Sequence, residues 1–133
     1  MKYGNIEIPN EFLKNMHGNT FVLYKGLLYL AHKNGLEELH VDLLDYDKDE
    51  KLAIVKAKAI LRDEEGYSRE FSAIGDASPK NVNGMIAPHV IRMAGTRAKA
   101  RALRDALGIG ICSVEELGDG EISKDNAFDG SVM

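Results

Sequence analysis

The chain has 133 residues, a formal net charge of −4 and 44% hydrophobic residues. This size and composition fit one globular domain that can bury a core without covalent cross-links. The single cysteine, Cys112, excludes an internal disulfide, and no apolar run approaches the roughly 20 residues that a membrane helix requires. The first residues lack the apolar core of a secretory signal, so we expect a cytoplasmic protein.

The first part of the chain predicts short elements. Residues 9–16 open with a proline, which suits a first helical turn, and predict a short helix. Residues 20–24 are β-branched and aromatic and predict a strand. Residues 26–34 predict a helix that ends before Gly35. Leucine and valine then alternate with polar residues over 39–43, which predicts a half-buried strand.

The middle of the chain predicts an antiparallel meander. Residues 52–62 place alanine, valine and leucine on one face of a strand and Lys56 and Lys58 on the other. A charged turn containing a glycine leads into a further strand over 67–74. These two strands and the preceding one form a three-stranded sheet. Residues 75–84 are rich in turn formers and predict a loop.

A long helix is predicted from about 87 to 107, with Gly108 as its end. One side of this helix carries small or apolar side chains that suit the alanine-rich face of strand 52–62: Ile91, Ala94, Gly95, Ala98, Ala102 and Ala106. The fold class is therefore α+β, an antiparallel three-stranded β-meander followed by a long helix packed on the sheet, with an N-terminal strand and helix.

The end of the chain predicts a short final helix and a tail. Ser113 and Glu116 have capping-box spacing, which indicates the start of the short helix. The last residues are rich in glycine and aspartate and poor in apolar side chains. We therefore expect one globular domain over 1–118 and a flexible acidic tail over 119–133.

Charge is segregated along the sequence. Acids dominate 37–50 and the segment after Val114, whereas every charged residue between 77 and 104 is basic: Lys80, Arg92, Arg97, Lys99, Arg101 and Arg104. On a helical projection Arg97, Arg101 and Arg104 gather beside the buried stripe, and Arg92 and Lys99 lie on its other flank. The three arginines repel one another unless an anion meets them. Either an internal carboxylate or an external phosphate chain would serve.

Four segments resemble one family in the same order along the chain. They are Tyr24-Lys25-Gly26, residues 55–62, residues 70–75, and the stretch Thr-Arg-Ala-Lys-Ala-Arg-Ala-Leu-Arg-Asp-Ala-Leu-Gly at 96–108. From about 21 to 111 the chain thus resembles the single-strand annealing proteins of the Rad-fifty-two type. The resemblance implies a homo-oligomeric ring or filament that holds single-stranded DNA in a groove between the sheet and the helix.

In this family, basic residues of the helix hold the backbone of the strand, and Arg101 and Arg104 match two of those positions. The candidate nucleic-acid-binding set joins them to other basic residues of the helix, sheet and loops: Arg97, Lys99, Lys25, Lys56, Lys58 and Lys80. We expect charge reversal of Arg101 and Arg104 to glutamate to abolish binding, because repulsion replaces attraction. The fold should be preserved, because both residues lie off the predicted buried stripe. Arg97 is expected to be structural.

We therefore expect a non-enzymatic protein, without cofactor or metal, that binds single-stranded DNA and anneals strands in recombination or repair. An oligomeric scaffold or adaptor with no nucleic-acid role is the alternative. A nuclease that holds Mg²⁺ with aspartates of the acidic segment is a third possibility, although a solvated strand edge is the simpler explanation of these residues: Asp42, Asp45, Asp47 and Asp49.

Overall fold

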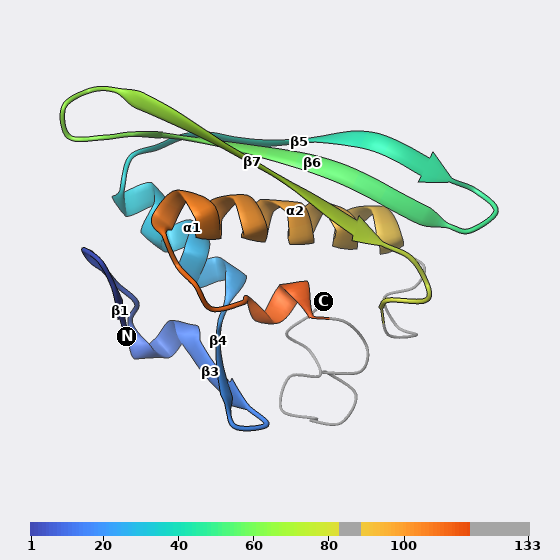
Figure 1. Cartoon of the computed structure of the whole chain (residues 1–133), viewed down its shortest axis with the longest axis horizontal. Coiled ribbons are helices and arrows are strands. Elements are labelled where there is room, and N and C mark those ends of the chain that lie inside the picture. Colours follow the sequence, from blue (N-terminus) through green and yellow to red (C-terminus); the bar gives the residue numbers. More distant parts are fainter. Residues whose placement is uncertain (83–88, 118–133) are drawn as a thin grey trace.

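The computed structural model describes residues 1–82 and 89–117, so the predicted tail over 119–133 lies outside the described residues. Figure 1 shows a sheet, one helix lying beneath it, a second helix that passes behind one end of the first, and the N-terminal hairpins below them. In chain order the elements are β1 (Lys2–Tyr3), β2 (Ile6–Glu7), the 3₁₀ turn η1 (Asn10–Phe12), β3 (Leu13–Met16), β4 (Asn19–Val22), α1 (Tyr24–Lys33), β5 (Leu36–Asp47), β6 (Leu52–Arg62), β7 (Ser68–Ala77), α2 (Val90–Leu107) and the 3₁₀ turn η3 (Val114–Glu116).

The upper layer is an antiparallel sheet in the order β5-β6-β7, which confirms the predicted meander. The central strand pairs Ala57 with Val41 on one side and with Ala73 on the other. Strand β7 continues to Ala77, so the predicted loop begins later than expected. Strand β5 is also longer than predicted, and its pairing with β6 is interrupted by irregularities near each end.

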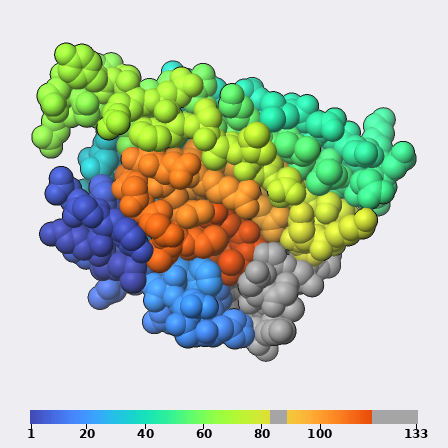
Figure 2. Space-filling view, viewed as in Figure 1, coloured from blue at the N-terminus to red at the C-terminus, as the bar shows by residue number. Residues whose placement is uncertain are grey.

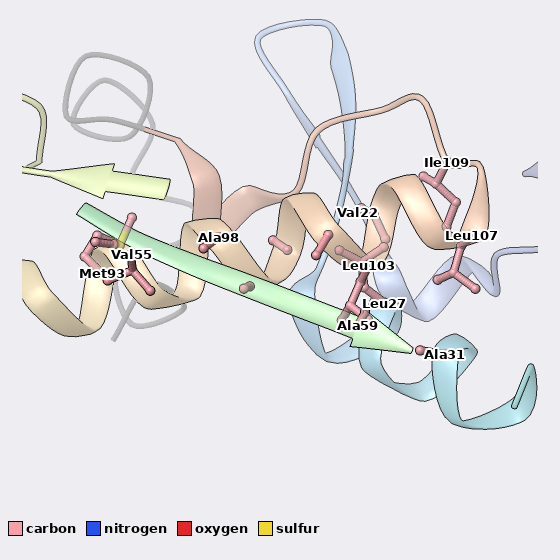
Figure 3. Packing of buried hydrophobic residues seen from close by; sticks show 14 of the residues in the cluster. Val22, Leu27, Ala31, Val55, Ala59, Met93, Ala98, Leu103, Leu107 and Ile109 are labelled. Atoms are coloured by element: carbon pink, nitrogen blue, oxygen red, sulfur yellow. The ribbon is translucent and has the colours of Figure 1, made fainter. Parts of the chain in front are cut away.

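Helix α2 packs on β6 and β7 because both surfaces carry small side chains. Ala57 and Ala59 of β6 and Ala98 of α2 are completely buried, and Figure 3 shows this face of β6 turned toward α2. The predicted stripe is confirmed over its centre, where Ala94, Gly95, Ala98 and Ala102 are buried. It is wrong at Ile91, which is exposed, because α2 lies over β6 and β7 and leaves the first strand of the sheet largely uncovered.

The predicted helix over 9–16 is wrong. Only the short turn η1 forms there, and β3 then pairs with β4 through a tight connection. His17 and Gly18 form this connection with φ values of 51° and 81°, the positive values that a two-residue hairpin turn requires. The predicted strand at 20–24 corresponds to β4, and the predicted helix at 26–34 corresponds to α1, which begins two residues earlier.

Helix α2 ends at Gly108, as predicted. Gly108 has φ 71°, and the amide of Ile109 donates a hydrogen bond of 2.9 Å to the carbonyl of Arg104. This left-handed residue reverses the chain and brings η3 back beneath α2. The predicted final helix is the single turn η3, and its predicted start is supported by a 2.9 Å hydrogen bond from the Ser113 amide to the Glu116 carboxylate. Neither α1 nor α2, the α-helices of the described ranges, is long and apolar enough to cross a membrane.

Candidate nucleic-acid interface

Arg97 is buried, with only 4% of its surface exposed. Its Nη1 donates hydrogen bonds to the Asp76 carbonyl at 2.8 Å and the Asn81 side-chain oxygen at 2.9 Å. Its Nη2 donates to the Asn81 carbonyl at 2.8 Å and the Leu117 carbonyl at 3.2 Å. The projection that placed Arg97 off the buried surface is therefore wrong, because the chain after β7 and the end of η3 cover this side of α2. Arg97 therefore links α2 by hydrogen bonds to the end of β7, to the loop that follows β7 and to the end of η3.

Arg104 forms a two-pronged ion pair inside the protein. Its Nε and Nη2 donate to the two carboxylate oxygens of Glu116 at 2.9 and 2.8 Å. The Glu116 side chain is only 2% exposed. Burial alone would raise the pKa of Glu116, but hydrogen bonds from Arg104 and from the Ser113 backbone hold the pKa of this carboxyl below its usual value. Glu116 is thus a buried carboxylate whose main partner is Arg104.

Arg101 shares the same carboxylate from the rim. Its Nε lies 3.4 Å from Oε1 of Glu116, its Nη1 donates to the Ile74 carbonyl at 3.0 Å, and its side chain is 38% exposed. Figure 2 views the molecule from the same direction as Figure 1, with the surface of α2 visible between β7 and the N-terminal segments. The structure therefore brings Arg101 and Arg104 together and supplies the internal carboxylate that was one of the two expected anions.

The remaining predicted lysines do not join this cluster. Lys56 and Lys58 alternate with buried alanines on β6, so they lie on the outer face of the sheet, opposite α2. Lys58 lies 3.9 Å from Glu70, and Lys80, after the end of β7, lies 3.3 Å from Glu50. The candidate set is thus distributed over different faces of the molecule.

A different site lies on the other flank of α2, toward β5. One cavity of about 250 Å³ is lined by residues of β5, β6 and α2: Val41, Leu43, Val55, Ile91, Arg92, Gly95, Thr96 and Lys99. A second cavity of about 380 Å³ lies at the start of α2 and is lined by Tyr46, His89, Val90, Ile91 and Arg92. Because the two share Ile91 and Arg92, we treat them as one depression, the β5–α2 trough.

The floor of the trough is apolar and open to solvent. Val41, Leu43 and Ile91 remain 43%, 52% and 46% exposed, because α2 is displaced toward β6 and β7. Arg92 and Lys99 are also among the lining residues, and among the described residues neither makes an ion pair with a carboxylate. The trough thus combines positive charge with exposed apolar surface.

Tyr24 connects the trough to α1. The Nζ of Lys99 lies 5.6 Å from the centroid of the Tyr24 ring, a cation–π distance. Tyr24 is the first residue of α1, and its amide donates a 2.8 Å hydrogen bond to the carboxylate of Glu115 in η3. Lys25 follows it and is exposed. Of the predicted set, Lys99 is therefore in the trough and Lys25 is beside the residue that Lys99 contacts.

Sequence reasoning left Arg92 out of the candidate set. The helical projection already placed it with Lys99, but the resemblance directed attention to the opposite flank. The largest cavity described, of about 570 Å³, is a poorer candidate because Lys33, Arg62 and Arg69 share its lining with Asp63 and Glu64. A polyanion gains less from a surface that carries both signs of charge.

Comparisons with known proteins add no further constraint on this site. No family model matches the chain, and no curated protein matches its sequence significantly.

Proposed function

We propose that the protein is a non-enzymatic single-stranded DNA-binding and annealing protein, and that the strand lies in the β5–α2 trough. The observation that carries this proposal is the pair of cations Arg92 and Lys99 beside an exposed apolar floor. Phosphates meet the two cations, and the less polar sugars meet Val41, Leu43 and Ile91. The bases point outward, where a complementary strand can pair with them.

The family resemblance supports the same function but favours the other flank of α2. Arg104 is a poor contact for an external phosphate, because Glu116 already takes two of its donors. Arg101 is more exposed and is the better placed of the two to reach a strand that crosses α2. We therefore assign Arg92 and Lys99 as the main contacts and Arg101 as a secondary one.

The first test reverses the charge of the trough. Arg92→Glu with Lys99→Glu is expected to lower affinity for a labelled oligothymidine on the order of 100-fold at low salt, because two attractive contacts become repulsive. Fluorescence anisotropy measures this loss. In the wild type, log affinity should fall against log salt with a slope of about −0.7 per phosphate neutralised. Affinity should also be independent of sequence, since backbone contacts carry no base information.

A matched control changes the net charge equally on the outer face of the sheet. Lys56→Glu with Lys58→Glu should retain most of the wild-type affinity. Equal losses in the two double variants would show that total charge, and not the trough, determines binding. Wild-type affinity in a folded Arg92→Glu, Lys99→Glu protein, checked by circular dichroism, would refute the trough assignment.

The proposal includes self-association into a ring or filament. Within the described residues, β5 and β7 each pair on one side only, so both edges of the sheet carry unpaired backbone groups. We expect analytical ultracentrifugation at micromolar concentration to give a mass several times 14.7 kDa. A monomeric mass would contradict this part of the proposal. An oligomer that binds no oligonucleotide at low salt would favour the scaffold alternative.

A further inference from the structure

The segment after Leu117 has the chemistry that complements the trough. Within 118–133 acids alternate with apolar residues, the acids being Asp119, Glu121, Asp125 and Asp129, the larger apolar residues Ile122, Phe128, Val132 and Met133, and the one base Lys124. The trough offers the opposite charge, from Arg92 and Lys99, beside an apolar floor. An acidic peptide with apolar side chains is therefore the class of ligand that this surface fits.

We propose that residues 118–133 bind in the β5–α2 trough and compete there with single-stranded DNA. The competition rests on the proposed function, whereas the docking of the segment does not. The carboxylates meet Arg92 and Lys99, as phosphates do, and an apolar side chain such as Phe128 covers Val41, Leu43 and Ile91. The segment thereby lowers the apparent affinity of the protein for single-stranded DNA, which must displace it.

The point of attachment makes this docking geometrically accessible. The Leu117 carbonyl accepts a 3.2 Å hydrogen bond from Arg97 of α2, so the segment starts beside the helix that forms one wall of the trough. It must pass around a helix about 10–12 Å in diameter. A chain as long as 118–133 reaches about 50 Å when extended, and its root-mean-square span as a coil is roughly 20–25 Å. Either length is sufficient.

Attachment also lowers the affinity that the contact needs. A short tether gives an effective concentration in the millimolar range, so an intrinsically weak contact occupies the trough for much of the time. If the segment occupies nine-tenths of the protein, the apparent affinity for DNA falls about tenfold. Replacing the acids of the segment should therefore raise the apparent affinity for DNA about tenfold.

Docking is tested on the full chain without nucleic acid. The variant Asp119→Asn, Glu121→Gln, Asp125→Asn, Asp129→Asn should shift the methyl resonances of Val41, Leu43 and Ile91 more than those of core residues. The control Glu11→Gln, Asp49→Asn, Glu64→Gln, Glu65→Gln changes exposed acids elsewhere and alters the net charge equally. It should leave the three methyl groups unchanged. Unchanged methyl groups in the tail variant, or equal shifts in both variants, would overturn the proposal.

Competition is then measured with the same two variants and a labelled oligothymidine. The tail variant should bind about tenfold more tightly than the wild type, and the control should match the wild type. Methyl shifts with no oligonucleotide binding in any form would sustain docking and refute the proposed function. Binding that is equal in all three proteins would refute competition alone. Methyl shifts that disappear on dilution would assign the trough to a second copy of the chain and overturn the docking in cis.

Discussion

Replacing Arg104 with alanine is expected to lower the free energy of unfolding by about 3 kcal/mol, because it leaves a buried carboxylate without its main partner. Glu116 is 2% exposed and takes two hydrogen bonds from Arg104. Arg101, with its Nε at 3.4 Å, and the Ser113 amide would remain. The loss should therefore fall at the lower end of what a broken buried ion pair costs. Urea denaturation followed by circular dichroism measures it.

A double-mutant cycle separates the ion pair from the loss of packing. Arg104→Met with Glu116→Leu removes both charges, and its cost should be well below the sum of the two single substitutions. Arg101→Ala, on the exposed rim of the same cluster, should cost less than Arg104→Ala. An Arg104→Ala protein that unfolds with the wild-type free energy would show that Glu116 is solvated in solution.

The lowered pKa of Glu116 gives this pair a pH dependence of known sign. A carboxyl whose pKa is lower in the folded state contributes its full stability above the pKa of the unfolded chain. That contribution is lost as the pH falls through the lower, folded-state pKa. The wild type should therefore lose part of its advantage over Arg104→Ala in acid, while the advantage is complete at neutral pH.

The ion pair also changes what charge reversal at the resemblance positions would mean. The sequence alone suggests that Arg101→Glu with Arg104→Glu would abolish binding and preserve the fold. The contact with Glu116 leads us to expect instead that Arg104→Glu destabilises the fold, since a glutamate there would face a buried carboxylate. Loss of binding in that double variant would not distinguish a lost contact from a lost fold. The trough variants do not carry this ambiguity.

Local patterns were sufficient to predict the three-stranded sheet and a helix packed against it. The alternation over 52–62 and the four-residue spacing of Ala94, Ala98 and Ala102 each specify one buried face, and small surfaces pack closely on small surfaces. The β3–β4 hairpin was missed because its strands are short and its turn depends on the positive φ of His17 and Gly18. No hydrophobic period distinguishes so short a segment from a helical turn.

The site was less predictable, because it depends on contacts between segments that are distant in sequence. Glu116 reaches Arg104 only after Gly108 has reversed the chain, and Asn81 reaches Arg97 from the loop after β7. The spacing along α2 placed Arg92 and Lys99 together correctly. It could not show that α2 lies off-centre on the sheet, and this offset is what leaves the floor of the trough exposed.

Gly75→Ala is the sharpest test of how closely α2 packs against β7. A Cβ at Gly75 would lie 2.5 Å from the Ala94 carbonyl oxygen and closer still to the Ala98 amide nitrogen, both main-chain atoms of a rigid helix. The helix or strand must move, and overpacking of this kind costs about 3 kcal/mol of unfolding free energy.

Gly95→Ala is the matched control within α2, because a Cβ there meets nothing within 4 Å, and alanine should stabilise the helix by about 0.5–1 kcal/mol. The two substitutions are therefore expected to have opposite signs in urea denaturation. A Gly75→Ala protein as stable as the wild type would mean that α2 does not lie against β7 as closely as described.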